Sequence, residues 1–295
     1  MAALAGVVAV PVVPFGAGGG IDRPVYRLLL RRLLDAGIGT VTPNGNTGEF
    51  YALTPQERQA VLRDTLAETA HHPATVIAGV GHDLPTAIGA AEHARACGAQ
   101  LVMVHQPVHP YVSPDGWAAY HRAVAGAVPE LGVVPYVRDP LLDGSTMAEL
   151  GERCPNVLGV KYAVPDAARF AAFARDAGLD RFVWLAGLAE LYAPAYFAVG
   201  ATGFTSGLAN VAPRVPLDML AALRAGDYPG AMKVWELVRA FEDLRAAGRS
   251  ADNVSVVKEA LAALGLCRRE VRPPSSVLPD DRRAEVAAAV QGWGL

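Results

Sequence analysis

Short apolar segments alternate with amphipathic helical segments along most of the chain, and this alternation limits the folds that are possible. The apolar segments span residues 6–15, 38–43, 74–80, 100–104, 132–137, 157–163, 182–186 and 202–206, and the helical segments span 22–36, 55–70, 85–96, 114–127, 146–153, 166–177, 188–199 and 213–225. Strands that alternate strictly with helices indicate a parallel sheet covered by helices. Eight such pairs in about 220 residues favour a (β/α)8 TIM barrel over an open doubly wound sheet.

Three further helical segments follow the eighth pair, at residues 228–246, 254–264 and 280–290. No linker of low complexity separates them from the preceding residues. We therefore expect a catalytic barrel at residues 1–225 and a C-terminal helical extension, residues 226–295, that packs on it. The hydrophobic fraction of 52% is sufficient for a large core.

Composition excludes several classes of protein. A net charge of −3 provides no basic surface for nucleic acid. The apolar N-terminus lacks the basic region of an export signal, and the apolar segment 183–201 is interrupted by Glu190 and Pro194, so we expect no membrane span. Three widely spaced cysteines indicate neither a disulfide framework nor a metal site. These features are typical of a cytoplasmic protein with reduced thiols.

Lys161 is an unusual residue for a buried strand. It lies in the apolar segment 157–163, and it is one of three lysines in a chain with 26 Lys and Arg residues. Arginine stays protonated in proteins, whereas a desolvated lysine can lose its proton and attack the carbonyl of a keto acid. The alternative is a lysine at a strand end whose ammonium group reaches water.

Two other strand ends carry candidate site residues. The turn Asn44–Glu49 contains two glycines and a threonine, and its backbone N–H groups can bind a carboxylate; alternatively it is an ordinary polar turn. Tyr136 can transfer a proton and Arg138 can hold a carboxylate, or they are a strand-end tyrosine and a surface arginine paired with Asp139. In a barrel, the C-terminal ends of the strands form one face, so these residues and Lys161 would lie together.

Four segments together resemble the dihydrodipicolinate synthase/N-acetylneuraminate lyase family: residues 45–49, Tyr136, residues 159–161 and residues 203–207. The resemblance covers essentially the whole chain. It implies that Lys161 forms a Schiff base with a 2-keto acid, without metal or organic cofactor, and that Tyr136 transfers protons. It also implies that the substrate is bound by Asn46, Thr47, Gly48, Arg138 and Ser206, and that the protein is a homo-oligomer, a dimer or a tetramer.

The chain departs from the synthases of this family. They have two threonines where this chain has Asn46 and Thr47, and two adjacent tyrosines where residues 109–112 contain only Tyr111. Residues 48–51 and 136–139 resemble the 5-dehydro-4-deoxyglucarate dehydratase branch instead, although Tyr162 replaces the aspartate that follows the lysine there. We therefore expect dehydration of a keto-deoxy sugar acid, with or without decarboxylation. A pyruvate-dependent aldolase or dihydrodipicolinate synthase-type condensation is the first alternative, and a non-catalytic barrel that binds a keto acid is the second.

Overall fold

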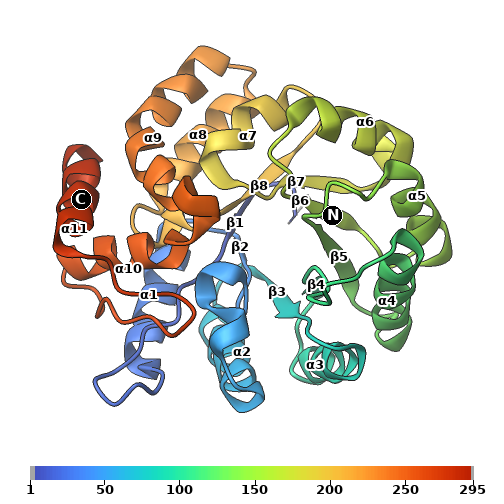
Figure 1. Cartoon of the computed structure of the whole chain (residues 1–295), viewed down its shortest axis with the longest axis horizontal. Helices are drawn as coiled ribbons and strands as arrows, with labels where there is room; N and C mark the ends of the chain where they lie inside the picture. Colours follow the sequence, from blue (N-terminus) through green and yellow to red (C-terminus); the bar gives the residue numbers. More distant parts are fainter. Residues whose placement is uncertain (1–3, 294–295) are drawn as a thin grey trace.

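A computed structural model describes residues 4–293 of the chain, and its centre is a closed parallel barrel (Figure 1). The strands follow one another around the barrel in sequence order, and the first pairs with the last through Val8 and Thr205. The predicted (β/α)8 barrel is therefore confirmed. The strands are β1 (Val7–Ala9), β2 (Thr40–Val41), β3 (Thr75–Val80), β4 (Leu101–Val104), β5 (Gly132–Val137), β6 (Gly159–Tyr162), β7 (Val183–Ala186) and β8 (Gly203–Ser206).

Side chains alternate between the inside of the barrel and the helices around it. In β5, Val134 and Tyr136 belong to the apolar cluster inside the barrel, whereas Val133 and Val137 belong to the cluster beneath the helices. Lys161 is the register partner of Tyr136 on the neighbouring strand. Because paired residues of adjacent parallel strands lie on the same face of a sheet, Lys161 also projects into the barrel.

Polar side chains fix where the surrounding helices begin. Each helix from α1 to α6 begins after a Ser, Thr or Asp whose side chain accepts the backbone N–H group three residues later. The predicted capping box of Thr54 and Glu57 is present. The helices are α1 (Arg23–Asp35), α2 (Pro55–Thr69), α3 (Leu84–Ala96), α4 (Pro114–Ala127), α5 (Gly144–Arg153), α6 (Ala167–Ala177), α7 (Ala189–Phe197) and α8 (Arg214–Arg224).

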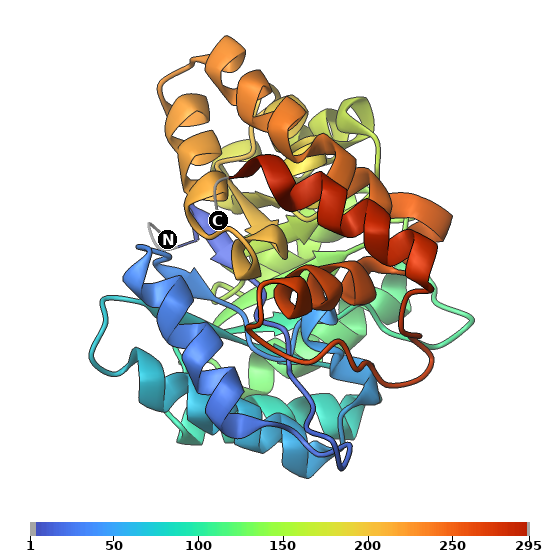
Figure 2. The ribbon, with the colours of Figure 1, turned by 90° about the vertical axis from the view of Figure 1, so that its left-hand side faces the viewer.

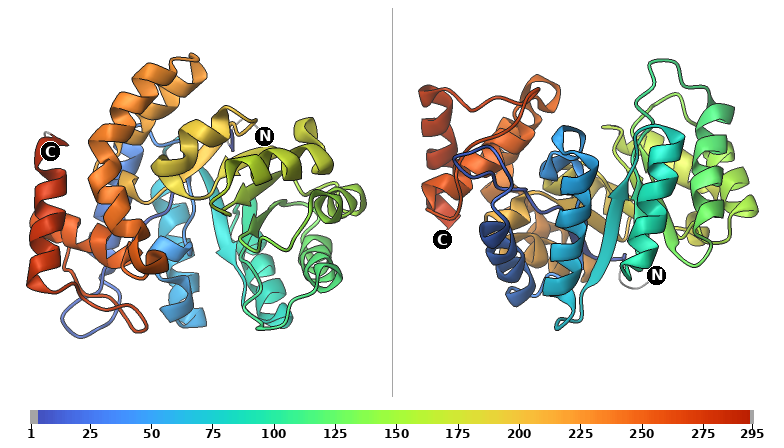
Figure 3. Two further views of the ribbon diagram at one scale, coloured as in Figure 1. Left: turned by 45° about the horizontal axis from the view of Figure 1, so that its top comes forward. Right: turned by 90° about the horizontal axis from the view of Figure 1, so that it is seen from below.

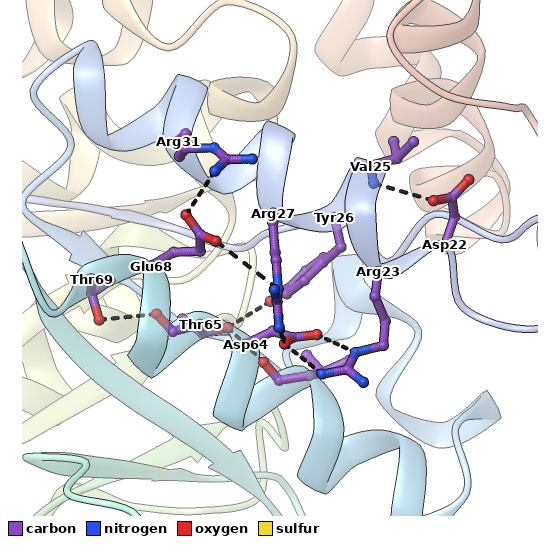
Figure 4. Close-up of polar contacts among 11 residues, drawn as sticks. Asp22, Arg23, Val25, Tyr26, Arg27, Arg31, Asp64, Thr65, Glu68 and Thr69 are labelled. Carbon is purple, nitrogen blue, oxygen red and sulfur yellow. Dashed lines mark hydrogen bonds and ion pairs between the residues drawn. The ribbon is translucent and has the colours of Figure 1, made fainter.

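An ionic network around the buried Asp64 carboxylate joins α1 to α2 (Figure 4). The Asp64 carboxylate accepts hydrogen bonds from Arg23 (Nε, 2.6 Å) and from Arg27 (Nε, 3.0 Å). Beside it, the hydroxyl groups of Tyr26 and Thr65 lie 2.8 Å apart. The network holds α2 against α1, and α2 follows directly on the turn after β2 that carries several of the candidate site residues.

The C-terminal helices α9 (Tyr228–Ser250), α10 (Asn253–Ala263) and α11 (Asp280–Val290) lie on one side of the barrel, next to α1 and α8 (Figures 2 and 3). Regular helical geometry in α9 ends at Ala247, where ψ is 151°, and Gly248 and Arg249 have positive φ. An apolar cluster joins these helices to the barrel side, with Phe241 of α9 and Leu261 of α10 among its members. Among residues 4–293, no helix has both the length and the apolar character needed to cross a membrane.

Candidate functional site

A cavity of about 430 Å³ opens at the C-terminal ends of the barrel strands. Five residues that were selected from the sequence line it together, namely Asn46, Thr47, Tyr136, Arg138 and Lys161. They come from the turn after β2 and from the ends of β5 and β6. The fold therefore brings together side chains that lie more than a hundred residues apart in the sequence.

Lys161 is buried in the barrel wall, with 4% of its surface exposed. Its Nζ atom lies 4.3 Å from the centre of the Tyr136 ring. Burial, assisted by the positive charge of Arg138, lowers the pKa of Lys161 to about 8. The alternative of a lysine at a strand end that reaches bulk water is wrong, and about one amine in ten is uncharged at pH 7.

Tyr136 stands beside Lys161 as a protonated phenol. Its burial raises its pKa, while the positive charge of Arg138 and a side-chain hydrogen bond from Asn46 act in the opposite direction. The ring also contacts the buried His105, whose imidazole lies with its centre 6.1 Å away. Burial lowers the pKa of His105 to about 3, so this neighbour is neutral. Tyr136 can therefore donate a proton to a bound ligand and take one back.

The turn after β2 forms the 3₁₀ helix η1 (Asn46–Gly48). Thr47 is buried at the cavity wall, and the Asn46 Oδ1 atom has no hydrogen-bond partner among the described residues. Gly48 does not line the cavity, because it packs on the Pro11 carbonyl oxygen, which would lie 2.8 Å from a Cβ atom at this position. Its N–H group donates to Gly45 at 3.0 Å. Asn46 and Thr47 thus line the cavity, whereas Gly48 does not.

Ser206 is also absent from the cavity wall, where its neighbours Thr205 and Gly207 are found. Successive residues of a strand face opposite sides, so the two neighbours face inward and Ser206 faces the helices. Its hydroxyl donates to Glu190 of α7 at 2.5 Å and accepts from the Ala209 N–H group at 2.9 Å. Thr205 thus lines the cavity at the end of β8, whereas Ser206 does not.

Glu49 ties the turn after β2 to the C-terminal helices. Its buried carboxylate forms an ion pair with Lys258 of α10 and accepts the Arg272 backbone N–H group at 2.8 Å. The Lys258 ammonium group also lies 4.0 Å from the centre of the Phe15 ring. Two of the three lysines of the chain are thus buried, one in the cavity wall and one beneath the turn.

The C-terminal segment itself forms part of the cavity wall, a role for which the sequence offered no signal. The lining residues from this segment are Glu242, Arg245, Ala246, Arg249, Ser250, Ala251, Asn253, Val254, Arg272, Pro274 and Ser275. Among all described lining residues, the arginines and Lys161 provide five basic groups against two carboxylates, Glu49 and Glu242. Such a wall favours an anionic ligand. Within residues 4–293, no three His, Cys, Asp or Glu side chains are grouped as metal ligands.

Comparisons with known proteins agree with the fold. A model of the Dihydrodipicolinate synthetase family matches residues 3–292. The chain is 33% identical over 289 residues to a probable 5-dehydro-4-deoxyglucarate dehydratase from Ralstonia nicotianae, covering 97% of this chain and 92% of that protein. A relative of the same name from Bradyrhizobium diazoefficiens is 31% identical over 292 residues, covering 97% of this chain and 91% of the relative.

A solved structure is similar over the whole chain. The crystal structure of dihydrodipicolinate synthase from Bacillus clausii superposes with a TM-score of 0.95 at 36% identity, covering 100% of this chain and 99% of that one. The names of these similar proteins divide between a dehydratase and a synthase. The residues of this chain's own cavity must therefore distinguish the two reactions.

Proposed function

The chain belongs to the dihydrodipicolinate synthetase family, and on that premise we propose that Lys161 forms a Schiff base with a 2-keto acid. Family membership makes the chain a lyase of the class I aldolase type. The proposed reaction is dehydration of a keto-deoxy sugar acid, with or without decarboxylation. The observation that carries the proposal is the buried Lys161, whose pKa is lowered to about 8, beside Tyr136 in a cavity lined by basic groups.

The first step is attack of the neutral Lys161 amine on the keto carbon. A carbon–nitrogen bond forms, and Tyr136 passes protons so that the keto oxygen leaves as water. The resulting iminium ion withdraws electrons, so a proton on C3 can leave to form an enamine. The enamine then expels the hydroxyl group on C4, which takes up a proton and departs as water.

The cavity wall supports an acidic substrate. We assign Asn46 and Thr47 to the C1 carboxylate because they line the cavity from the turn after β2, whereas Arg138 lines it from the end of β5. Arg138 would hold the distal end of the substrate, where a planar guanidinium can pair with a second carboxylate or with hydroxyl groups. Because the iminium ion of Lys161 is itself the electron sink, the proposed reaction requires no metal or organic cofactor.

Two residues favour dehydration over condensation. Asn46 stands where the synthases have a threonine, so one hydroxyl of their proton relay is missing. Tyr111 is 86% exposed on the loop after β4, and it has no adjacent second tyrosine. The pyruvate-dependent aldolase or synthase remains the second candidate, because the similar structure at 36% identity is named a dihydrodipicolinate synthase. A condensation could proceed through the same imine of Lys161.

Reductive trapping tests the proposal. The protein is incubated with pyruvate, reduced with borohydride and mapped by mass spectrometry, with Lys161→Met and Lys233→Met as the matched pair of variants. We expect an adduct on Lys161 in the native protein and in the variant of Lys233, which is an exposed lysine on α9. An unmodified Lys161 would refute Schiff-base formation.

Turnover then separates the candidate functions. Release of water from 5-dehydro-4-deoxyglucarate, faster than aldol condensation of pyruvate, is the expected result. Faster condensation would favour the aldolase. An adduct without turnover of either kind would support a barrel that only binds a keto acid.

We also propose that the protein is a cytoplasmic homo-oligomer, a dimer or a tetramer. Val108 and Tyr111 after β4 and Leu141 after β5 are exposed apolar side chains on loops that follow neighbouring strands, and a second copy of the chain would cover them. Light scattering after gel filtration gives the mass directly. Within each copy, we propose residues 1–225 as the barrel and 226–295 as its extension; residues 1–3 and 294–295 of these ranges lie outside the described structure.

A further inference from the structure

We propose that Arg245 of α9 binds the C1 carboxylate of the keto acid together with Thr47. The inference rests on the proposed function and deepens it. It assigns a cationic group of the C-terminal helices to a place where the sequence analysis expected neutral donors from the turn after β2. Arg245 would then select keto acids over uncharged ketones.

Arg245 is a buried, partly satisfied cation in the cavity wall, with 4% of its surface exposed. Its Nη1 atom donates to Glu242 at 2.5 Å, and its Nη2 atom donates to Asn253 at 3.2 Å. Its Nε atom has no partner among the described residues. A guanidinium group has five N–H donors. The two contacts therefore orient Arg245 and leave donors for a ligand.

Gly207 shows where the guanidinium group is directed. A Cβ atom on Gly207 would lie 2.3 Å from Arg245 Nη2 and 3.3 Å from Thr47 Oγ1. Gly207 has φ −88° and ψ −29°, which any residue can adopt. A glycine is therefore needed here because a side chain would collide with its neighbours, and not because of the backbone conformation. The Arg245 cation and the Thr47 hydroxyl thus converge above one small residue at the end of β8, inside the same cavity as Lys161.

The surroundings leave this cation available to an anionic ligand. Glu242 is its ionic partner, and Glu190 lies next to the pair. Burial and the negative charge of Glu242 raise the pKa of Glu190, which favours the uncharged form of Glu190. One carboxylate therefore competes with the ligand for Arg245. A charge-assisted pair between a guanidinium and a carboxylate is about twice as strong as a hydrogen bond between neutral groups.

Two ketones that differ in one group test the inference. Pyruvate carries a carboxylate beside its carbonyl, whereas hydroxyacetone carries an uncharged CH₂OH group there. The measurement is the concentration of each that half-saturates borohydride trapping on Lys161. In Arg245→Gln we expect this concentration to rise about 10- to 100-fold for pyruvate and to stay within about twofold for hydroxyacetone.

Gly207→Ala provides an independent variant that keeps the arginine. Its Cβ atom displaces the guanidinium group, so this variant should also need a higher concentration of pyruvate, but not of hydroxyacetone, for half-saturation. This test holds even if Arg245→Gln does not fold. Arg239→Gln, on the same helix with a side chain that is 55% exposed, is the matched control and should behave like the native protein.

The outcomes separate this inference from the function on which it rests. If the native protein traps neither ketone, Schiff-base formation itself is refuted. A different result is that the native protein traps both ketones while the variants at Arg245 and Gly207 keep its preference for pyruvate, or lose affinity for both ketones equally. That result refutes the role of Arg245 and leaves Schiff-base formation standing.

Discussion

Lys161 should form imines at neutral pH far faster than an ordinary lysine. An ordinary lysine in this protein would have a pKa of 10.5, and burial of the side chain lowers the pKa of Lys161 to about 8. At pH 7 about one amine in ten is then neutral, compared with about three in ten thousand for an unperturbed lysine. The structure therefore predicts roughly 300-fold more of the nucleophilic form at this pH.

The rate of imine formation with pyruvate, trapped with excess cyanoborohydride, measures this pKa between pH 6 and 10. The rate must first be shown to be independent of the reductant concentration. We expect it to rise tenfold per pH unit at low pH and to level off above about pH 8. A rate that still rises tenfold per unit at pH 9.5 would show that burial does not lower the pKa as we argue.

A variant of Arg138 tests what lowers the pKa of Lys161. The positive charge of Arg138 also lowers this pKa, although burial contributes more. Arg138→Gln should therefore move the midpoint upward, and the shift should be well below one unit because Arg138 is exposed and its charge is screened by water. Arg153→Gln, on the outer surface of α5 with a side chain that is 57% exposed, should leave the midpoint unchanged.

Three further predictions concern stability. Lys161→Met should raise the free energy of unfolding by about 3 kcal/mol at pH 7, because the pKa of Lys161 in the folded protein lies below its value in the unfolded chain. The gain should be complete below about pH 8 and disappear as the pH rises towards 10.5. A gain in urea unfolding that does not depend on pH would contradict this prediction. Lys258→Met should cost about 3–5 kcal/mol because it leaves Glu49 buried and unpaired, and adding Glu49→Gln should restore part of the loss in the same assay. Gly79→Ala should lower the melting temperature and weaken pyruvate trapping, because its Cβ atom would lie 2.1 Å from the Asn44 carbonyl oxygen at the start of the site turn; unchanged trapping would show that the turn tolerates the shift.

Local patterns in the sequence were sufficient for the barrel. Alternation of apolar runs and helical segments predicted eight strands and eight helices, because each strand must be buried on both faces. Boundaries were less exact: the first apolar run was expected at residues 6–15, but β1 ends at Ala9, and Pro11 and Pro14 beyond it have no N–H group for a sheet ladder. The cap at Thr54 was found correctly because it depends on residues within one helical turn.

The place of Lys161 also followed from the sequence, because few positions in a barrel strand can accommodate a lysine. Tyr136 and Thr47 followed from the ends of other strands. The sequence could not show which side of a strand end faces the cavity. Ser206 was therefore expected where the structure has Thr205, because a shift of one residue along a strand reverses the side on which a side chain lies.

Contacts between distant parts of the chain were decided by tertiary structure alone. Glu49 pairs with Lys258 across 209 positions of sequence, and Arg245 reaches Gly207 and Thr47 from a helix that the sequence marked only as an extension. Both contacts depend on how α9 and α10 pack against the barrel. That packing is determined by apolar surfaces, and the local sequence of an apolar surface does not show which other surface it will contact. The sequence by itself determined the barrel and its buried lysine; the packing of the last helices determined which further charged groups line the cavity with that lysine.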